Sequence, residues 1–142
     1  MLHGPFLKRL IIFLLINFAG LYLGSLLMDQ GPTSSWYASL HKAPWTPPGW
    51  IFGAAWAFIM ICYSVYLAMF FKGHWYGPKE IGLIALTVIL NVGWNYVFFA
   101  QHYIGAGLLL LTLLLGALIF MFIYYKQENA KIIRLWLAPY IL

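Results

Sequence analysis

Long uncharged and apolar stretches are the feature that most constrains this chain. No Asp, Glu, Lys or Arg occurs in residues 10–28, 43–71 or 81–125. About 20 apolar residues cross the hydrocarbon core of a bilayer, so the last stretch is long enough for two spans. With 64% hydrophobic and 8% charged residues, the chain is too apolar for an ordinary soluble domain. We therefore expect an all-α, multi-pass integral membrane protein.

The polar break Gln101-His102-Tyr103 divides the longest stretch in two. The sequence then predicts four full-length helices and a short fifth one, at residues 6–27, 47–71, 81–100, 104–124 and from Ile132 or Leu135 to Leu142. At 1.5 Å per residue, the fifth helix reaches about half way through the hydrocarbon core. We expect one domain, residues 1–142, that forms a five-helix bundle with a truncated fifth helix.

Positive charges predict the orientation of this bundle. All lysines and arginines except Lys42 fall on the side of the N terminus in the predicted topology. Because cytoplasmic loops are rich in Lys and Arg, we expect the N terminus in the cytoplasm and the loop that contains Lys42 on the far side. Anionic lipid, rather than nucleic acid, is the partner that this charge distribution favours. The sequence does not indicate which membrane holds the protein.

Asp, Glu, Lys, Arg and His are absent from the four predicted spans beyond their first turns. Ion-coupled transporters, proton pumps and most membrane hydrolases need such groups, so these classes are disfavoured. The four histidines, His102 among them, fall in separate interfacial segments and lack metal-ligand spacing. We interpret them as residues at the level of the lipid headgroups and expect no metal site. The single cysteine, Cys62, excludes an internal disulfide.

Residues 36–56 are rich in tryptophan and proline at an expected membrane boundary. Prolines fix φ and remove hydrogen-bond donors, so the chain should stay extended until a helix begins at Thr46 or Pro47. Phe52 and Trp56 then fall near the start of that helix. Such aromatic side chains suit an opening that receives a flat apolar ligand.

Two asparagines, Asn91 and Asn95, are four residues apart in the third predicted helix, on one face with Phe98. An amide buried in a bilayer needs a hydrogen-bond partner on another helix or on a ligand. Two possibilities stay open for Asn95. It could bond to helix 1, through Asn17 or a backbone carbonyl, or it could contact a ligand. Amides cannot act as general acids or bases at neutral pH, but they can orient the polar edge of a ligand.

Glycines at small-xxx-small spacing predict close helix approach. These are Gly20 and Gly24 in the first helix and Gly49 and Gly53 in the second. Glycines in the fourth helix allow the same interpretation or a homodimer face; they are Gly105, Gly107 and Gly116. The sequence does not distinguish these uses.

Three motifs, in this order, resemble those of the tryptophan-rich sensory protein and translocator protein family. They are Trp36-Tyr37 followed by Leu40-x-Lys42-x-Pro44-x-x-Pro47-Pro48, then Asn91-Val92-Gly93-Trp94, and finally Ala138-Pro139-Tyr140. The resemblance implies a pocket between helices 1, 2, 3 and 5, below a first loop that acts as a lid. It also implies the ligand-binding residues Trp36, Pro47, Phe52, Trp56, Asn91, Trp94, Pro139 and Tyr140.

By this resemblance, the expected ligand is a porphyrin or haem, bound by a carrier or sensor that has no resident cofactor. One alternative is an oxidative or light-dependent enzyme that degrades porphyrin, with Trp56 as its candidate catalytic residue. Another is a stress-regulatory scaffold. The family's last motif continues to a tryptophan three residues after the tyrosine, whereas this chain ends at Leu142. If the natural protein ends at Leu142, we expect an incomplete pocket wall at the fifth helix; a longer natural chain would complete it.

Overall fold

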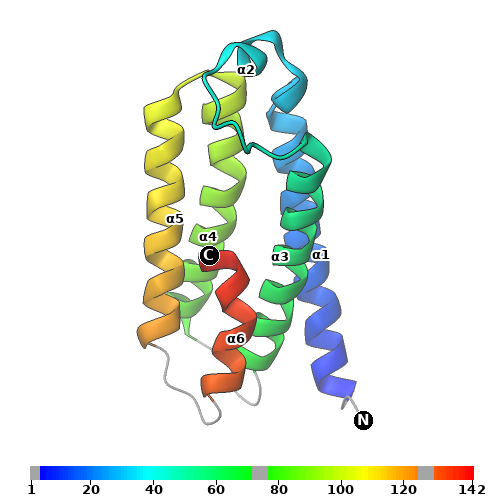
Figure 1. Cartoon of the computed structure of the whole chain (residues 1–142). Coiled ribbons are helices and arrows are strands. Elements are labelled where there is room, and N and C mark those ends of the chain that lie inside the picture. The colour runs from blue at the N-terminus through cyan, green and yellow to red at the C-terminus, as the bar shows by residue number, and fades with distance from the viewer. Residues whose placement is uncertain (1–3, 72–76, 125–129) are drawn as a thin grey trace.

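The computed structural model describes residues 4–71, 77–124 and 130–142. These residues form helices and connecting loops without a strand (Figure 1). In chain order the elements are α1 (Gly4–Leu27), η1 (Gly31–Thr33), α2 (Ser35–Ser39), α3 (Gly49–Phe70), α4 (Pro78–Asn95), η2 (Tyr96–Ala100), α5 (Ile104–Tyr124) and α6 (Ala130–Ile141). The all-helical prediction is confirmed.

Four of the described helices, α1, α3, α4 with η2, and α5, are long and apolar enough to cross a membrane. A fifth spanning helix is not found among the described residues, where α6 has 12 residues and a length of about 18 Å. It rises between α3 and α5 from the end of the bundle that holds the N terminus, and it stops about midway (Figure 1). Its buried residues Ile133 and Leu137 join the core formed by α3, α4 and α5.

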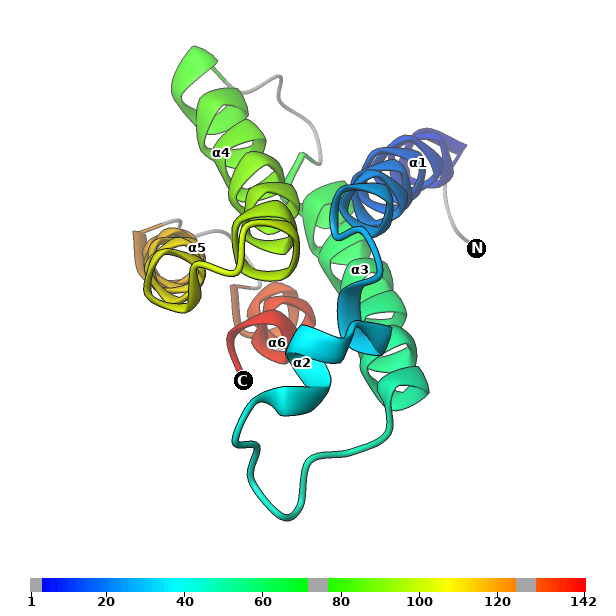
Figure 2. The same cartoon turned by 90° about the horizontal axis from the view of Figure 1, so that it is seen from above.

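Helix α1 changes its partner along its length. Near the N terminus it packs on the last turns of α3, where Asn17 Nδ2 donates to Ser64 Oγ at 2.8 Å and Arg9 Nε donates to the Ala68 carbonyl at 3.2 Å. Nearer the other end it packs on α4: a Cβ at Gly20 would lie 3.5 Å from Val88. The first turns of α3 therefore lie apart from α1 in the view from above (Figure 2).

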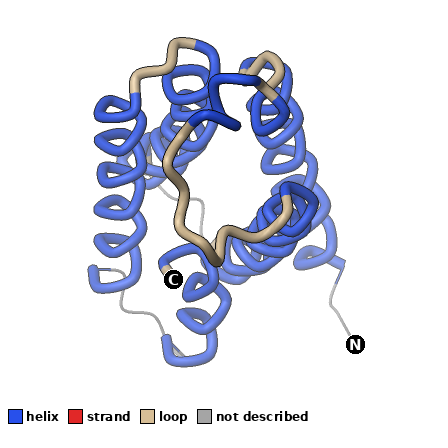
Figure 3. The backbone as a smooth tube through the Cα atoms, turned by 45° about the horizontal axis from the view of Figure 1, so that its top comes forward, coloured by secondary structure: helices blue, strands red, loops and turns tan. Residues whose placement is uncertain are grey.

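The connection from α1 to α3, residues 28–48, crosses the end of the bundle opposite the N terminus, and we call it the lid (Figure 3). Its helix α2 is capped by Ser34, whose Oγ accepts from the Tyr37 N–H at 3.1 Å. Helix α3 begins at Gly49 and not at Thr46 or Pro47. The helical conformation is disfavoured at Pro47 because Pro48 follows it, and Pro48 has the extended ψ of 149° that precedes the helix.

Helix α4 ends in a π-helical turn, η2, at Tyr96–Ala100. The sequence predicts an uninterrupted helix over residues 81–100, but the wider turn changes the direction of the last side chains. Such turns occur inside longer helices and are frequent at functional sites. Here the turn brings Phe98 and Phe99, with ring centroids 4.9 Å apart, onto the same end of the bundle as the lid.

The basic residues lie where the predicted topology puts them. Those at the described end that holds the N terminus are Lys8, Arg9, Lys79, Lys131 and Arg134, whereas Lys42 belongs to the lid at the opposite end (Figure 1). Lys72 and Lys126 lie outside the described residues. With its four spanning helices, this is a multi-pass integral membrane protein.

Candidate ligand pocket

A cavity of about 600 Å³ opens beneath the lid, where α3 separates from α1 and α4. Its size is within the range of about 300–1,000 Å³ that is typical of small-molecule sites. The described side chains that line it are uncharged. They are Phe18, Gly20, Leu21, Tyr22, Ser25, Met28, Pro32, Tyr37, Gly49, Phe52, Gly53, Trp56, Asn91, Trp94, Asn95, Phe98 and Phe99.

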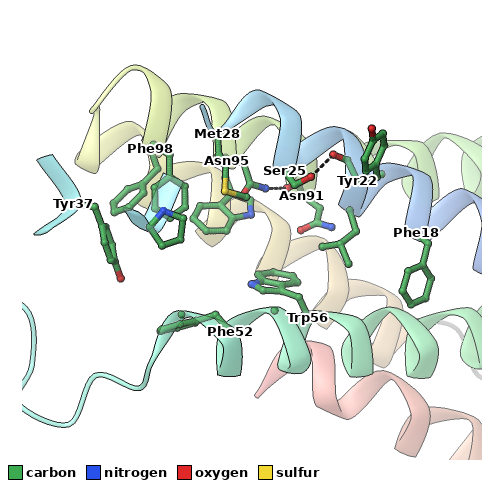
Figure 4. A pocket seen from close by; sticks show the side chains of 17 residues that line it. Phe18, Tyr22, Ser25, Met28, Tyr37, Phe52, Trp56, Asn91, Asn95 and Phe98 are labelled. Carbon is green, nitrogen blue, oxygen red and sulfur yellow. Dashed lines mark hydrogen bonds between the residues drawn. The ribbon is translucent and has the colours of Figure 1, made fainter. Parts of the chain in front are cut away.

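Two tryptophans from different helices meet at this cavity. The rings of Trp56 on α3 and Trp94 on α4 are stacked, with centroids 6.1 Å apart and planes at 27°. Figure 4 shows Trp56 extending from α3 toward Asn91 on the opposite wall. Trp94 also contacts Phe99 at 5.7 Å, so flat aromatic surfaces continue from α3 to η2. Apolar, planar walls of this kind suit a flat hydrophobic ligand.

The polar groups of the cavity are few and come mainly from α4. Asn91 is 7% exposed, and its Nδ2 lies 4.0 Å from the sulfur of Met60, a weak contact. Asn95 Nδ2 donates to the Asn91 carbonyl at 2.9 Å, drawn as a dashed line in Figure 4. The indole nitrogen of Trp94 is shielded from solvent and has no hydrogen-bond partner among the described residues. Amide and indole groups here can hydrogen-bond a ligand but cannot transfer protons at neutral pH.

Of the two possibilities left open for Asn95, the hydrogen bond to helix 1 is not found among the described residues. Asn95 bonds within α4, and Asn17 bonds to Ser64 of α3 instead. The reason is that Gly24, not a polar residue, faces Asn95: a Cβ at Gly24 would lie 2.9 Å from Asn95 Nδ2. Close packing of a glycine against the amide leaves Asn95 on the cavity wall.

Four of the eight ligand-binding residues expected from the sequence line the cavity: Phe52, Trp56, Asn91 and Trp94. The other four do not line it. Trp36 contacts Phe98 from outside the cavity, and Pro47 is exposed in the lid. In α6, Tyr140 lies behind Trp56, with ring centroids 6.1 Å apart, and the adjacent Pro139 is half-buried. The cavity walls therefore come from α1, α3, α4, η2 and the lid, and α6 contacts the wall at Trp56.

The family resemblance implied a wall from helix 1, but sequence reasoning did not name the residues of α1 that form it. Phe18, Tyr22 and Ser25 line the cavity and recur at intervals of four and three residues (Figure 4). That spacing puts them on one face of a helix, so the pattern was a usable signal. Gly49 and Gly53 are also cavity residues: a Cβ at either position would meet nothing within 4 Å, which contradicts their predicted close packing.

Metal binding has no structural support in the described part of the chain, because no group of three or more His, Cys, Asp or Glu side chains could hold an ion there. Lys42, the basic residue of the lid, is not on the cavity wall. Its Nζ donates to the Tyr37 carbonyl at 3.0 Å and lies 4.3 Å from the centre of the Tyr37 ring. Its amine thus stabilises the lid.

Fold and cavity together define a class: a multi-pass helical membrane protein with an aromatic pocket under a lid at one membrane face. The chain belongs to the TspO/MBR family, whose sequence model matches residues 12–142. This membership confirms the resemblance of the three sequence motifs.

Relatives of known name occur in bacteria and animals. The chain is 29% identical over 139 residues to the tryptophan-rich protein TspO of Bacillus cereus. The matched region covers 95% of this chain and 87% of that protein. The chain is 35% identical over 106 residues to the translocator protein of Bos taurus, covering 70% of this chain and 62% of that protein. It is 32% identical over 85 residues to protein CrtK of Rhodobacter capsulatus, covering 56% and 52%.

Proposed function

We propose that the cavity binds a flat hydrophobic ligand of the porphyrin or haem class, and that the protein acts as a carrier or sensor for it. The stacked pair Trp56 and Trp94 on a wall without charged residues is the observation that carries this proposal. A planar macrocycle would pack its faces on these indoles, since stacking favours flat π systems. The name of the Bos taurus relative, translocator protein, fits a carrier.

The polar groups of the cavity would fix the orientation of the ligand. Asn91 would meet a polar group on the rim of the macrocycle, and a ligand acceptor at the indole N–H of Trp94 would satisfy a buried donor. The carboxylates of a porphyrin would face the lid and the headgroups, because a charge in an apolar wall without a partner is costly.

The test measures the binding of protoporphyrin to the protein in detergent, with quenching of tryptophan fluorescence as the readout. We expect Trp56→Ala to weaken binding by about 1–3 kcal/mol, the loss measured when a π system loses its aromatic stacking partner. Trp50→Ala is the matched control, because Trp50 lies on the same helix but is 73% exposed and does not line the cavity. Equal affinity of both variants would contradict the proposal.

A second function, oxidative or light-dependent breakdown of the bound porphyrin, has one observation in its favour. The electron-rich indoles of Trp56 and Trp94 lie on the wall where the macrocycle would sit. Loss of porphyrin absorbance under light, abolished in Trp56→Phe although binding persists, would support this reading. A scaffold whose ligand changes partner binding is the remaining alternative.

A further inference from the structure

The lid is attached to the bundle by aromatic contacts at one corner, where η2 leads into α5. Trp36 of α2 contacts Phe98 edge to face, with ring centroids 5.4 Å apart. The next residue, Tyr37, contacts Phe99 at 5.6 Å. Tyr37 lines the cavity together with both phenylalanines, so the lid forms part of the cavity wall at this corner.

His102 completes this corner. Its ring lies face to face with the Trp36 indole, with centroids 4.2 Å apart and planes at 15°. The indole is thus held between the His102 ring and the edge of Phe98. Sequence analysis interpreted His102 as a headgroup-level residue, because it is not near Trp36 in the sequence.

The backbone under His102 is held in place. His102 has a φ of 60°, in the left-handed region where residues other than glycine are uncommon. On one side the Gln101 N–H donates to the Tyr96 carbonyl at 3.0 Å, and on the other the Tyr103 N–H donates to the Val97 carbonyl at 3.1 Å. The backbone hydrogen bonds on both sides therefore fix the position from which the His102 ring contacts the lid.

Element η1 of the lid also contacts η2, whereas the hydrogen bonds of the described lid residues are internal or lead to its ends. Ser34 caps α2 and Lys42 binds Tyr37, but all three residues belong to the lid. Toward α1 the chain turns through Asp29 and Gly31, which both have positive φ, so the lid joins α1 by a tight corner. The aromatic contacts at His102, Phe98 and Phe99 thus fix the middle of the lid over the cavity.

We propose that His102 is the latch of the lid: a positioning residue that acts through Trp36 to hold α2 closed over the cavity and to slow the release of ligand. The inference rests on the proposed function for the identity of the ligand. The closed position of the lid follows from the ring contacts alone and can be measured without a ligand.

The first experiment is amide hydrogen exchange of residues 36–40 in the ligand-free protein. His102→Gly removes the ring and leaves a residue that adopts positive φ without strain, so a purely structural role in the backbone would leave exchange unchanged. We expect exchange in α2 to accelerate by about three- to tenfold, as for the loss of one stacked ring pair. Slower or unchanged exchange would overturn the latch.

Two further variants separate the ring from general effects. His102→Asn also tolerates positive φ but has no ring, so it should match His102→Gly, whereas His41→Asn makes the same chemical change at an exposed histidine of the lid and should match the parent. Adding His102→Gly to Trp36→Ala should cause no further acceleration, because Trp36→Ala already removes the contact between the indole and His102. Full additivity would show that His102 does not act through Trp36.

The second experiment measures the dissociation rate of protoporphyrin from the same variants. We expect His102→Gly to raise this rate by about the same factor as the exchange rate, with little change in the association rate. If the parent protein binds no porphyrin, the proposed function fails while the exchange result still decides the latch. If exchange in α2 accelerates but porphyrin release does not, the latch does not control this ligand and the proposal is overturned in that part.

Discussion

At the scale of single residues, glycines with the same sequence spacing have opposite roles. Gly24 lies against α4, where a Cβ would come within 2.9 Å of Asn95 Nδ2, whereas a Cβ at Gly53 would meet nothing within 4 Å. The spacing that predicts close helix approach is the same in both pairs. The difference arises from the path of α1, which leaves α3 and packs on α4. Gly24 therefore lies at a helix contact, whereas Gly53 faces the open cavity.

This difference predicts opposite effects of one substitution. Gly24→Ala should destabilise the protein by about 1–3 kcal/mol, because the new methyl group overlaps the Asn95 amide and must push the helices or the amide apart. Gly53→Ala should not lower the stability, since alanine favours the helix and open space receives its methyl group. Thermal unfolding of both variants in the same detergent tests this. Equal melting temperatures would contradict it.

At the scale of helices, hydropathy defines the existence of the spans and local geometry defines their ends. The predicted span at residues 104–124 agrees with α5 (Ile104–Tyr124), because Gln101-His102-Tyr103 interrupts the apolar run. The π turn η2 was not predictable, since one widened turn leaves no periodic signal in the sequence. The turn nevertheless helps place Phe98 and Phe99 on the cavity wall. The part of this wall that follows α4 could therefore not be predicted from the sequence.

Helices α1 and α3 are joined by a buried polar pair that does not line the cavity. Asn17 Nδ2 donates to Ser64 Oγ, and Ser64 Oγ in turn donates to the Met60 carbonyl at 2.7 Å. Asn17→Ala and Ser64→Ala should each lower the stability. Their double variant should reveal a coupling of about 0.6 kcal/mol, the average for such bonds between membrane helices. Unfolding of the four proteins in one lipid or detergent system measures the coupling.

This pair also separates stability from ligand binding. Neither Asn17 nor Ser64 lines the cavity, so the affinity of the folded protein for protoporphyrin should stay within about twofold of the parent. A large loss of affinity at temperatures where the variant is folded would show that the α1–α3 contact shapes the cavity. A coupling near zero would show that the hydrogen bond does not join the two helices energetically.

At the scale of the whole molecule, the sequence predicts the class of the protein better than the boundaries of its site. Apolar stretches and the family motifs led to a helical membrane bundle with aromatic residues at one end, which the structure has. Among the described residues, none of α6 lines the cavity, and α6 contacts the cavity residue Trp56 through Tyr140. The wall from helix 1 was expected from the family resemblance, and the structure adds its lining residues, Phe18, Tyr22 and Ser25 among them. Sequence motifs indicate candidate residues, but the packing of the helices determines which of these residues line the same cavity.

The orientation of the bundle is the last prediction. The described basic residues other than Lys42 lie at the end that holds the N terminus, so that end should face the cytoplasm. Single cysteines at Ser35 in the lid and at Lys131 in α6 occupy exposed positions at opposite ends. In intact cells a membrane-impermeant thiol reagent should label Ser35→Cys and not Lys131→Cys, and permeabilisation should make both reactive. The parent protein is the control, because its own thiol, Cys62, is buried at 3% exposure and should stay unlabelled. If only Lys131→Cys were labelled in intact cells, the predicted orientation would be wrong, and the lid and the cavity would lie on the cytoplasmic side.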